Sequence, residues 1–135
     1  MNQTAKIYPT QLLLVAAGGG GGTAMRYGLS VAFPGLATVL WINIVGAFIL
    51  GLLTGWLSVR GFSQKIAMQL RLFIGTGMMG GFTTYSTFAV GISRLATEGD
   101  IVTALLYGIL TVCGGISAAF LGTVCGRCSQ GLERK

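Results

Sequence analysis

The sequence predicts an all-α membrane protein with four transmembrane helices, the third of them broken at its centre. Of its 135 residues, 53% are hydrophobic and 9% are charged, and the mean hydropathy is +0.77, far more apolar than an ordinary soluble domain. Four apolar stretches are each long enough to cross a bilayer, which takes about 20 residues. We expect a single transmembrane domain over residues 1–135, with helices at about residues 11–33, 38–59, 69–94 and 101–124.

The few ionisable residues exclude several classes of function. Histidine is absent, and the acids Glu98, Asp100 and Glu133 lie in an expected loop or in the tail. The membrane interior therefore lacks the usual metal ligands and the acid/base pairs of hydrolases, so we expect no enzyme. The net charge of +6 is scattered over the helix flanks and forms no nucleic-acid patch. Cys125 and Cys128 form a Cys-Gly-Arg-Cys sequence, for which a redox or metal role is an alternative.

The first apolar stretch combines a glycine run with one arginine. Gly18 to Gly22 is not followed by the Gly-Lys-Ser/Thr of a phosphate loop, so the run predicts close backbone contact with another helix. Arg26 is a formal charge well inside this stretch. It either extends to the interface, faces a water-filled vestibule, or caps the carboxyl end of a neighbouring helix.

Asn43 is the strongest polar residue of the second stretch, which follows a tight Pro34-Gly35 connection. An amide side chain in a membrane needs hydrogen-bond partners. Asn43 therefore either ties two helices together or donates its NH₂ group to a passing anion.

The third stretch contains a glycine- and hydroxyl-rich interruption near its middle. Each glycine of Gly80-Gly81 costs a helix about 1 kcal/mol relative to alanine, so we expect two half-helices joined by extended backbone. The freed carbonyls and amides need partners, and such breaks recur at ion sites near the membrane midplane. Close packing through small residues is the alternative. The hydroxyl and aromatic residues that follow favour an ion site: Thr83, Thr84, Tyr85, Ser86, Thr87 and Phe88.

The fourth stretch carries a polar stripe. Residues 97–100 are expected to end the third helix and cap the fourth. Tyr107 and Thr111 follow at a spacing of four, which places two hydroxyls on one helical face. They form either a polar lane for an ion or, for Thr111, a bond to a carbonyl of its own helix.

Together these motifs resemble the small Fluc-type fluoride channels of bacteria. The similar features are Gly-Gly-x-Thr-Thr-aromatic-Ser-Thr-Phe in the third helix, Asn-x-x-Gly in the second, and a glycine-rich first helix ending in Arg-Tyr. The resemblance covers nearly the whole chain. It implies a multi-pass protein of the bacterial inner membrane that exports fluoride passively and assembles as an antiparallel homodimer with two pores.

The resemblance also implies roles for particular residues. Main-chain carbonyls of Gly80 and Thr83 would hold a structural Na⁺ on the dimer axis. Asn43 and the aromatic pair Tyr85 and Phe88 would line the fluoride path. The same path would include the hydroxyl track of Tyr107 and Thr111, and Arg26 would lie in the vestibule. Fluoride must exchange its water for donors and positive ring edges, and the hydroxyls of Ser86, Thr87 and Thr111 are candidate donors.

Three features depart from the family pattern. Tyr85 replaces a phenylalanine, and Gly115 occupies the third position of the hydroxyl track. Basic residues also favour one side of the membrane, where the expected topology places Lys6, Arg60, Lys65, Arg127, Arg134 and Lys135. This bias favours one orientation, so an oppositely oriented homologue is an alternative partner to a second copy of this chain.

Two other functions have similar sequence requirements. A small multidrug/proton antiporter has this length and helix number, but proton coupling needs an intramembrane carboxylate, which the expected spans lack. A structural membrane subunit would leave the motif of the third helix without a purpose.

Overall fold

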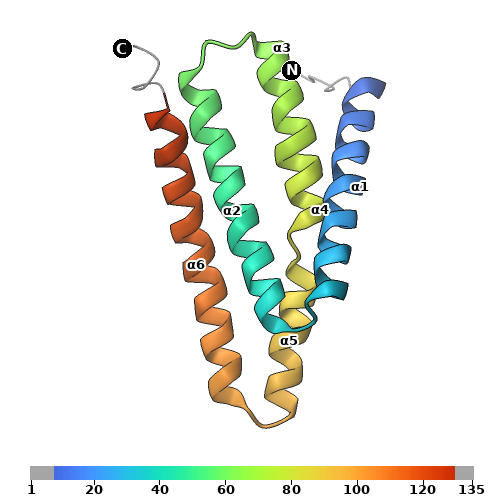
Figure 1. Ribbon diagram of the computed structural model, residues 1–135, viewed down its shortest axis with the longest axis vertical. Coiled ribbons are helices and arrows are strands. Elements are labelled where there is room, and N and C mark those ends of the chain that lie inside the picture. Colours follow the sequence, from blue (N-terminus) through green and yellow to red (C-terminus); the bar gives the residue numbers. More distant parts are fainter. Residues whose placement is uncertain (1–7, 130–135) are drawn as a thin grey trace, which may run out of the picture.

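The computed structural model describes residues 8–129, and every regular element in this range is a helix. The elements are α1 (Pro9–Ala32), α2 (Leu36–Val59), α3 (Gln64–Leu70), the π-helix η1 (Arg71–Met79), α4 (Gly80–Phe82), α5 (Tyr85–Thr97) and α6 (Ile101–Cys128). α3, η1 and α4 follow one another without a gap as one helical run (Figure 1). Four of the charged residues discussed above lie outside the described residues: Lys6, Glu133, Arg134 and Lys135.

Local sequence explains where the helices begin. Pro9 starts α1, where its missing N–H costs no helical hydrogen bond. The Ser63 hydroxyl caps α3 by accepting the Ile66 N–H at 3.4 Å. Asp100 caps α6, as the loop sequence predicted, by accepting the Thr103 N–H at 3.1 Å. Hydrogen bonds from the Thr103 hydroxyl and then from its N–H hold the pKa of the Asp100 carboxyl below its usual value.

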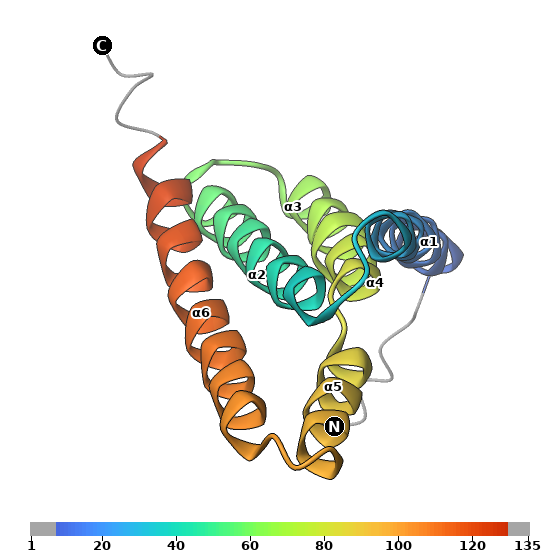
Figure 2. The same cartoon turned by 60° about the horizontal axis from the view of Figure 1, so that its bottom comes forward.

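α2 and α6 pack side by side through glycines. Both views place α6 and α1 on opposite sides of the molecule, with α2 and the α3–α4 run between them (Figures 1 and 2). Gly51 and Gly55 of α2 meet the backbone of α6, and Gly122 and Gly126 of α6 meet that of α2. A Cβ at any of these four positions would overlap a backbone carbonyl of the other helix. The absence of side chains therefore permits this close approach.

α1 contacts η1 and α4 in the same way. A Cβ on Gly18 or Gly22 would overlap the carbonyl of Phe73 or Met78. Gly20 faces open space, with nothing within 4 Å of the position of its Cβ. The predicted backbone contact is confirmed, and the members of the glycine run that make it lie one turn apart.

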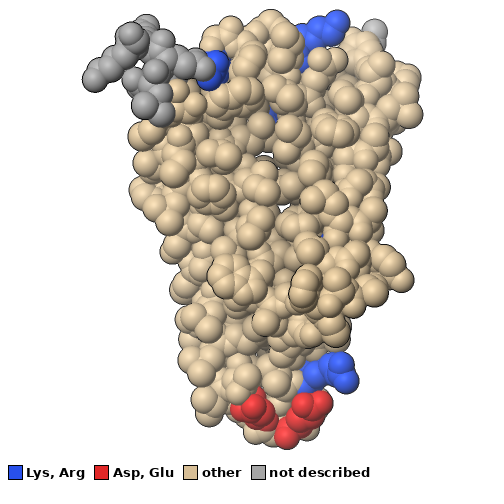
Figure 3. All heavy atoms as spheres, viewed as in Figure 1, with Lys and Arg blue, Asp and Glu red and all other residues tan. Residues whose placement is uncertain are grey.

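The surface suits a hydrocarbon environment. Among the described residues, α2 and α6 are long and apolar enough to cross a membrane, at 24 and 28 residues. Much of the outer face of α6 is exposed apolar side chain, including Leu105, Ile109, Ile116 and Phe120. Charged side chains gather at the two ends of the molecule in the face drawn in Figure 3, and most of the surface between them is uncharged. The chain is consistent with a membrane protein.

Candidate ion site at the helix interruption

The interruption consists of two extended residues. α4 ends at Phe82, Thr83 has φ −75° and ψ 158°, Thr84 has φ −145° and ψ 120°, and α5 begins at Tyr85. The expected position at Gly80-Gly81 differs from this, because both glycines are helical and belong to α4. Intrinsic glycine flexibility therefore does not determine where the helix stops.

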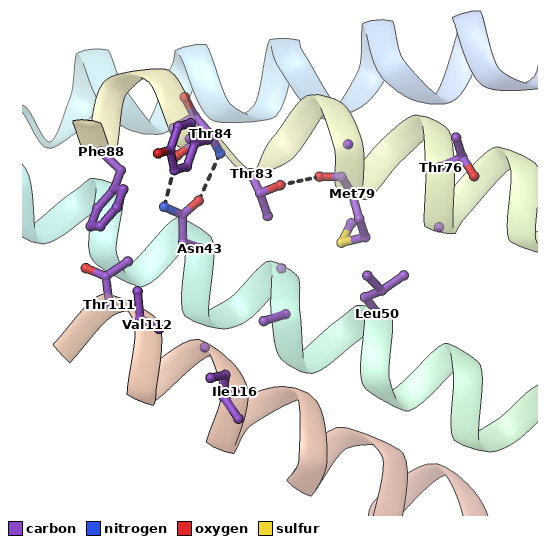
Figure 4. Close-up of a pocket in the computed structure, with 16 residues that line it drawn as sticks. Asn43, Leu50, Thr76, Met79, Thr83, Thr84, Phe88, Thr111, Val112 and Ile116 are labelled. Atoms are coloured by element: carbon purple, nitrogen blue, oxygen red, sulfur yellow. Dashed lines mark hydrogen bonds between the residues drawn. The ribbon is translucent and has the colours of Figure 1, made fainter. Parts of the chain in front are cut away.

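Asn43 holds the interruption from α2. Its Oδ1 accepts the Thr84 N–H at 2.9 Å, and its Nδ2 donates to the Thr84 carbonyl at 3.1 Å. Both bonds are drawn in Figure 4, where the amide of Asn43 points toward Thr84. Of the two roles considered for Asn43, this geometry shows the structural one, in which the side chain joins α2 to the extended segment between α4 and α5. The amide nitrogen carries a second N–H, which can serve another acceptor.

Hydroxyl groups complete the local network. The Thr83 hydroxyl and N–H both donate to the Met79 carbonyl, at 2.9 and 3.0 Å. The Thr84 hydroxyl oxygen accepts the Thr87 N–H at 3.2 Å and so caps α5. It also lies 3.0 Å from Thr87 Oγ1 and 3.3 Å from Ser86 Oγ. Thr84 is 9% exposed, and these bonds with Asn43 and Thr87 give its polar atoms partners inside the protein.

This network takes the helical donors of two carbonyls near the interruption, those of Gly80 and Thr83. In an uninterrupted helix, the Thr84 N–H would donate to the Gly80 carbonyl and the Thr87 N–H to the Thr83 carbonyl. Here Asn43 takes the first N–H and the Thr84 hydroxyl takes the second. Gly80 and Thr83 are the residues to which the family resemblance assigned cation-binding carbonyls.

Arg26 contacts the interruption from α1. Its Nε donates to the Gly81 carbonyl at 3.1 Å, and the Thr23 hydroxyl approaches the same oxygen at 3.5 Å. Of the three roles considered for Arg26, the structure shows a cap on the carboxyl end of a neighbouring helix. The side chain is half-buried.

A cavity of about 650 Å³ lies between α2, the broken helix and α6. In Figure 4, Phe88 and Thr111 lie toward one end, Asn43 and Thr83 in the middle, and Met79 and Leu50 toward the other end. The lining includes most of the predicted site residues: Asn43, Gly80, Thr83, Tyr85, Phe88 and Thr111. Four predicted residues are not part of it: Arg26, Ser86, Thr87 and Tyr107.

The aromatic residues form a short row beside the cavity. The ring centroids of Tyr85 and Phe88 are 6.0 Å apart, and those of Phe88 and Tyr107 are 5.5 Å apart. Tyr85 is 80% exposed, whereas Tyr107 is 7% exposed. The Tyr107 hydroxyl is buried and has no hydrogen-bond partner within residues 8–129.

The hydroxyls differ in what they can donate. The Thr111 hydroxyl donates to the Tyr107 carbonyl at 2.7 Å, which is the intrahelical alternative considered from the sequence. Ser86 and Thr87 are exposed. Because the Thr111 proton is used within α6, this residue offers the cavity its oxygen and methyl group and no hydrogen-bond donor in this conformation.

Two residues of the site were not predicted. Thr84 was noted only as part of the motif, yet its backbone is the partner of Asn43 and its hydroxyl caps α5. Threonine is a preferred N-cap residue, so a threonine directly before the restart of the helix could have identified it. Thr23, one turn before Tyr27, gave no distinguishing signal.

Comparison with known proteins places the chain in a family. A family model described as "CrcB-like protein, Camphor Resistance (CrcB)" matches residues 13–123. The chain belongs to this family. The CrcB model covers the described helical elements from within α1 into α6, including the interruption.

Related CrcB-type proteins carry names that specify an ion. A "Fluoride-specific ion channel FluC 2" of Leifsonia xyli is 38% identical over 94% of this chain and 92% of its own length. A "Fluoride-specific ion channel FluC" of Hyphomonas neptunium is 35% identical over 82% of this chain and 90% of its own. One of Methylobacterium nodulans is 41% identical over 78% and 86%. The predicted resemblance is confirmed.

The two cysteines of the Cys-Gly-Arg-Cys sequence do not line this cavity. Cys125 and Cys128 are exposed near the end of α6, and both carry free thiols. Within the described part of the chain, His, Cys, Asp and Glu form no group of three that could hold a metal.

Proposed function

We propose that this chain forms a fluoride-selective channel that lets fluoride leave the cytoplasm passively. The observation that carries the proposal is the interruption itself, where Asn43 and two extended threonines border a cavity walled by aromatic rings. Membership of the CrcB family and the names of the relatives support the choice of ion. The function is transport, not catalysis.

The proposed path uses weak, positive contacts. Asn43, Tyr85 and Phe88 line the cavity, and the second N–H of Asn43 Nδ2 and the edges of aromatic rings carry partial positive charge. Such groups accompany a partly dehydrated anion without binding it too tightly to release it. Ser86 and Thr87 are exposed at the start of α5 and serve as donors where fluoride enters or leaves.

The proposed topology has four spans in the bacterial inner membrane. α1, α2 and α6 each cross once, and α3 to α5 together make the broken third crossing. The charged ends of the molecule and the apolar surface between them support this arrangement (Figure 3). An antiparallel homodimer would cover the exposed Tyr85 and the open space beside Gly80. The bias of basic residues keeps an oppositely oriented homologue as the alternative partner.

A structural Na⁺ fits the residues at the interruption. The carbonyls of Gly80 and Thr83 have lost their helical donors to other acceptors, and Na⁺ prefers neutral oxygen ligands. When bound, the ion would satisfy these oxygens and add positive potential near the path. A bulky replacement of Gly80 should therefore abolish the Na⁺ dependence of dimer stability, whereas Thr83→Ala should leave it largely intact. Equal tolerance at both positions would argue against carbonyl ligands.

Purified protein in liposomes tests the function directly. Ion-selective electrodes should record fluoride efflux and, under the same gradient, little chloride efflux. Phe88→Ile keeps an apolar side chain but deletes the ring edge, and we expect about a hundredfold loss of fluoride flux with the assembly intact. Tyr85→Phe is the matched control and should retain flux. Absence of selective flux from the parent would favour the structural-subunit function, and proton-coupled flux would favour an antiporter.

A further inference from the structure

We propose that Arg26 is a positioning residue for fluoride conduction, acting through the hydrogen bond from its Nε to the Gly81 carbonyl and not through its charge. This inference rests on the proposed function. Gly81 lies between Gly80 and Thr83, whose carbonyls border the interruption. Holding the Gly81 carbonyl therefore restrains the direction of the adjacent Gly80 carbonyl and, through Phe82, that of the Thr83 carbonyl.

The packing of α1 brings Arg26 to this carbonyl. Gly18, Gly22 and Arg26 follow one another at a spacing of four and so share one face of α1. At the two glycines the backbones of α1 and η1 are in contact, with no room for a Cβ. One turn beyond Gly22, Arg26 reaches α4, and Gly81 also packs directly against α1, because a Cβ on it would overlap the Gly19 carbonyl. At this separation Arg26 reaches the Gly81 oxygen with Nε, before the end of its side chain.

The Gly81 carbonyl depends on α1 for its donors. Its helical donor would be the Tyr85 N–H, but the two extended residues separate Tyr85 from α4. Arg26 Nε at 3.1 Å and Thr23 Oγ1 at 3.5 Å approach this oxygen instead. The arginine bond is the shorter one and is half-buried, so its loss would leave the carbonyl with the long threonine contact alone.

Three substitutions separate the hydrogen bond from the charge. Glutamine places its Nε2 at the same number of bonds from Cα as arginine Nε, so Arg26→Gln keeps a donor there without the charge. Lysine keeps the charge, but its Nζ lies one bond further along the side chain. Arg26→Met supplies an unbranched apolar side chain that extends as far as the position of Nε, and it removes both the donor and the charge. Arg94→Gln, at an exposed residue of α5, controls for the loss of one positive charge.

Fluoride efflux from liposomes is the first readout. We expect Arg26→Gln to conduct within about threefold of the parent and Arg26→Met to lose about tenfold or more, with Arg26→Lys between them, since a half-buried carbonyl left with only the long Thr23 contact disfavours the conducting arrangement. The opposite order, with Arg26→Lys like the parent and Arg26→Gln like Arg26→Met, would show that charge matters and would overturn the proposal. Parental flux in all three variants would also overturn it.

Amide hydrogen exchange gives a second readout that does not require conduction. In the peptide covering residues 82–88, exchange should be parental in Arg26→Gln and Arg94→Gln and faster in Arg26→Met. If the parent conducts no fluoride but this pattern holds, the proposed function fails while Arg26 still positions the interruption. Unchanged exchange in Arg26→Met would refute the positioning role even in a working channel.

Discussion

The pairing of α2 with α6 and the pairing of α1 with η1 and α4 both bring two backbones together through glycines, yet only the second pairing includes a helix that is interrupted. In both, glycines one turn apart let two backbones touch: Gly51 and Gly55 in the first pair, Gly18 and Gly22 in the second. The helices of the first pair run without a break for 24 and 28 residues. Glycine content therefore explains close packing in both places and the interruption in neither.

The difference between the two regions is competition by polar side chains. In α2, the Thr54 hydroxyl donates to the Leu50 carbonyl of its own helix at 2.8 Å, which leaves the helical bonds in place. At the interruption, Asn43 and the Thr84 hydroxyl accept backbone N–H groups that a helix would use. An oxygen that accepts a backbone N–H, as those of Asn43 and Thr84 do, redirects that donor, whereas a hydroxyl that donates to a carbonyl of its own helix, as that of Thr54 does, leaves the backbone donors in place.

The largest expected effect concerns the glycines that pack against a neighbouring backbone in each region. Gly122→Ala and Gly22→Ala each place a Cβ on a backbone carbonyl of the neighbouring helix, so we expect a loss of about 3 kcal/mol or more and little folded protein. Gly115→Ala and Gly20→Ala meet nothing within 4 Å and should be neutral or stabilising by up to about 1 kcal/mol. Yield of monodisperse protein and thermal unfolding in detergent measure this. If the four variants behaved alike, the close approach would not be needed.

The next effect separates the two regions. Asn43→Asp keeps an acceptor for the Thr84 N–H but sets an oxygen against the Thr84 carbonyl and a negative charge beside the path. We expect fluoride flux in liposomes to fall by about a hundredfold or more while the protein still assembles. Thr54→Val, in the uninterrupted region of α2, is the control and should conduct like the parent. Undiminished flux at neutral pH in Asn43→Asp would remove Asn43 from the path.

A smaller effect tests the hydroxyl that caps α5. Thr84→Val preserves shape but removes the acceptor of the Thr87 N–H, which can then return to the Thr83 carbonyl. We expect a loss of about 1–2 kcal/mol and a weaker dependence of thermal stability on Na⁺, measured against N-methylglucamine. Thr84→Ser should restore both properties. Full Na⁺ dependence in Thr84→Val would mean that the cap does not free that carbonyl.

The smallest effect concerns the exposed cap at the start of α6. Asp100 accepts the Thr103 N–H as Thr84 accepts that of Thr87, but Asp100 is exposed to solvent. Because its folded pKa lies below the ordinary value of 3.8, its contribution is present above that pH and is lost as pH falls through the folded pKa. The melting temperature of the parent should therefore fall slightly more than that of Asp100→Asn between about pH 5 and pH 3. Parallel curves would show that the exposed cap contributes nothing measurable.

Several features of the molecule could be predicted from local sequence. The apolar composition determined a helical chain with an apolar surface, because backbone groups in hydrocarbon must bond within their own segment. The Thr97-Glu98-Gly99-Asp100 sequence located the turn before α6, since an aspartate binds an amide three residues ahead. The polar character of Asn43 likewise required a partner, without identifying it.

Tertiary structure decided which partner each polar group found. Propensity placed the interruption at Gly80-Gly81, but the helix continues through both glycines because, within residues 8–129, no side chain accepts their N–H groups as Asn43 accepts that of Thr84. Asn43 and Thr84 are 41 residues apart, and Arg26 and Gly81 are 55 apart. Such pairings depend on how closely α1 and α2 approach the broken helix. For α1 that distance is set by glycine contacts between backbones, which the glycine run indicated without identifying the helix that it would meet.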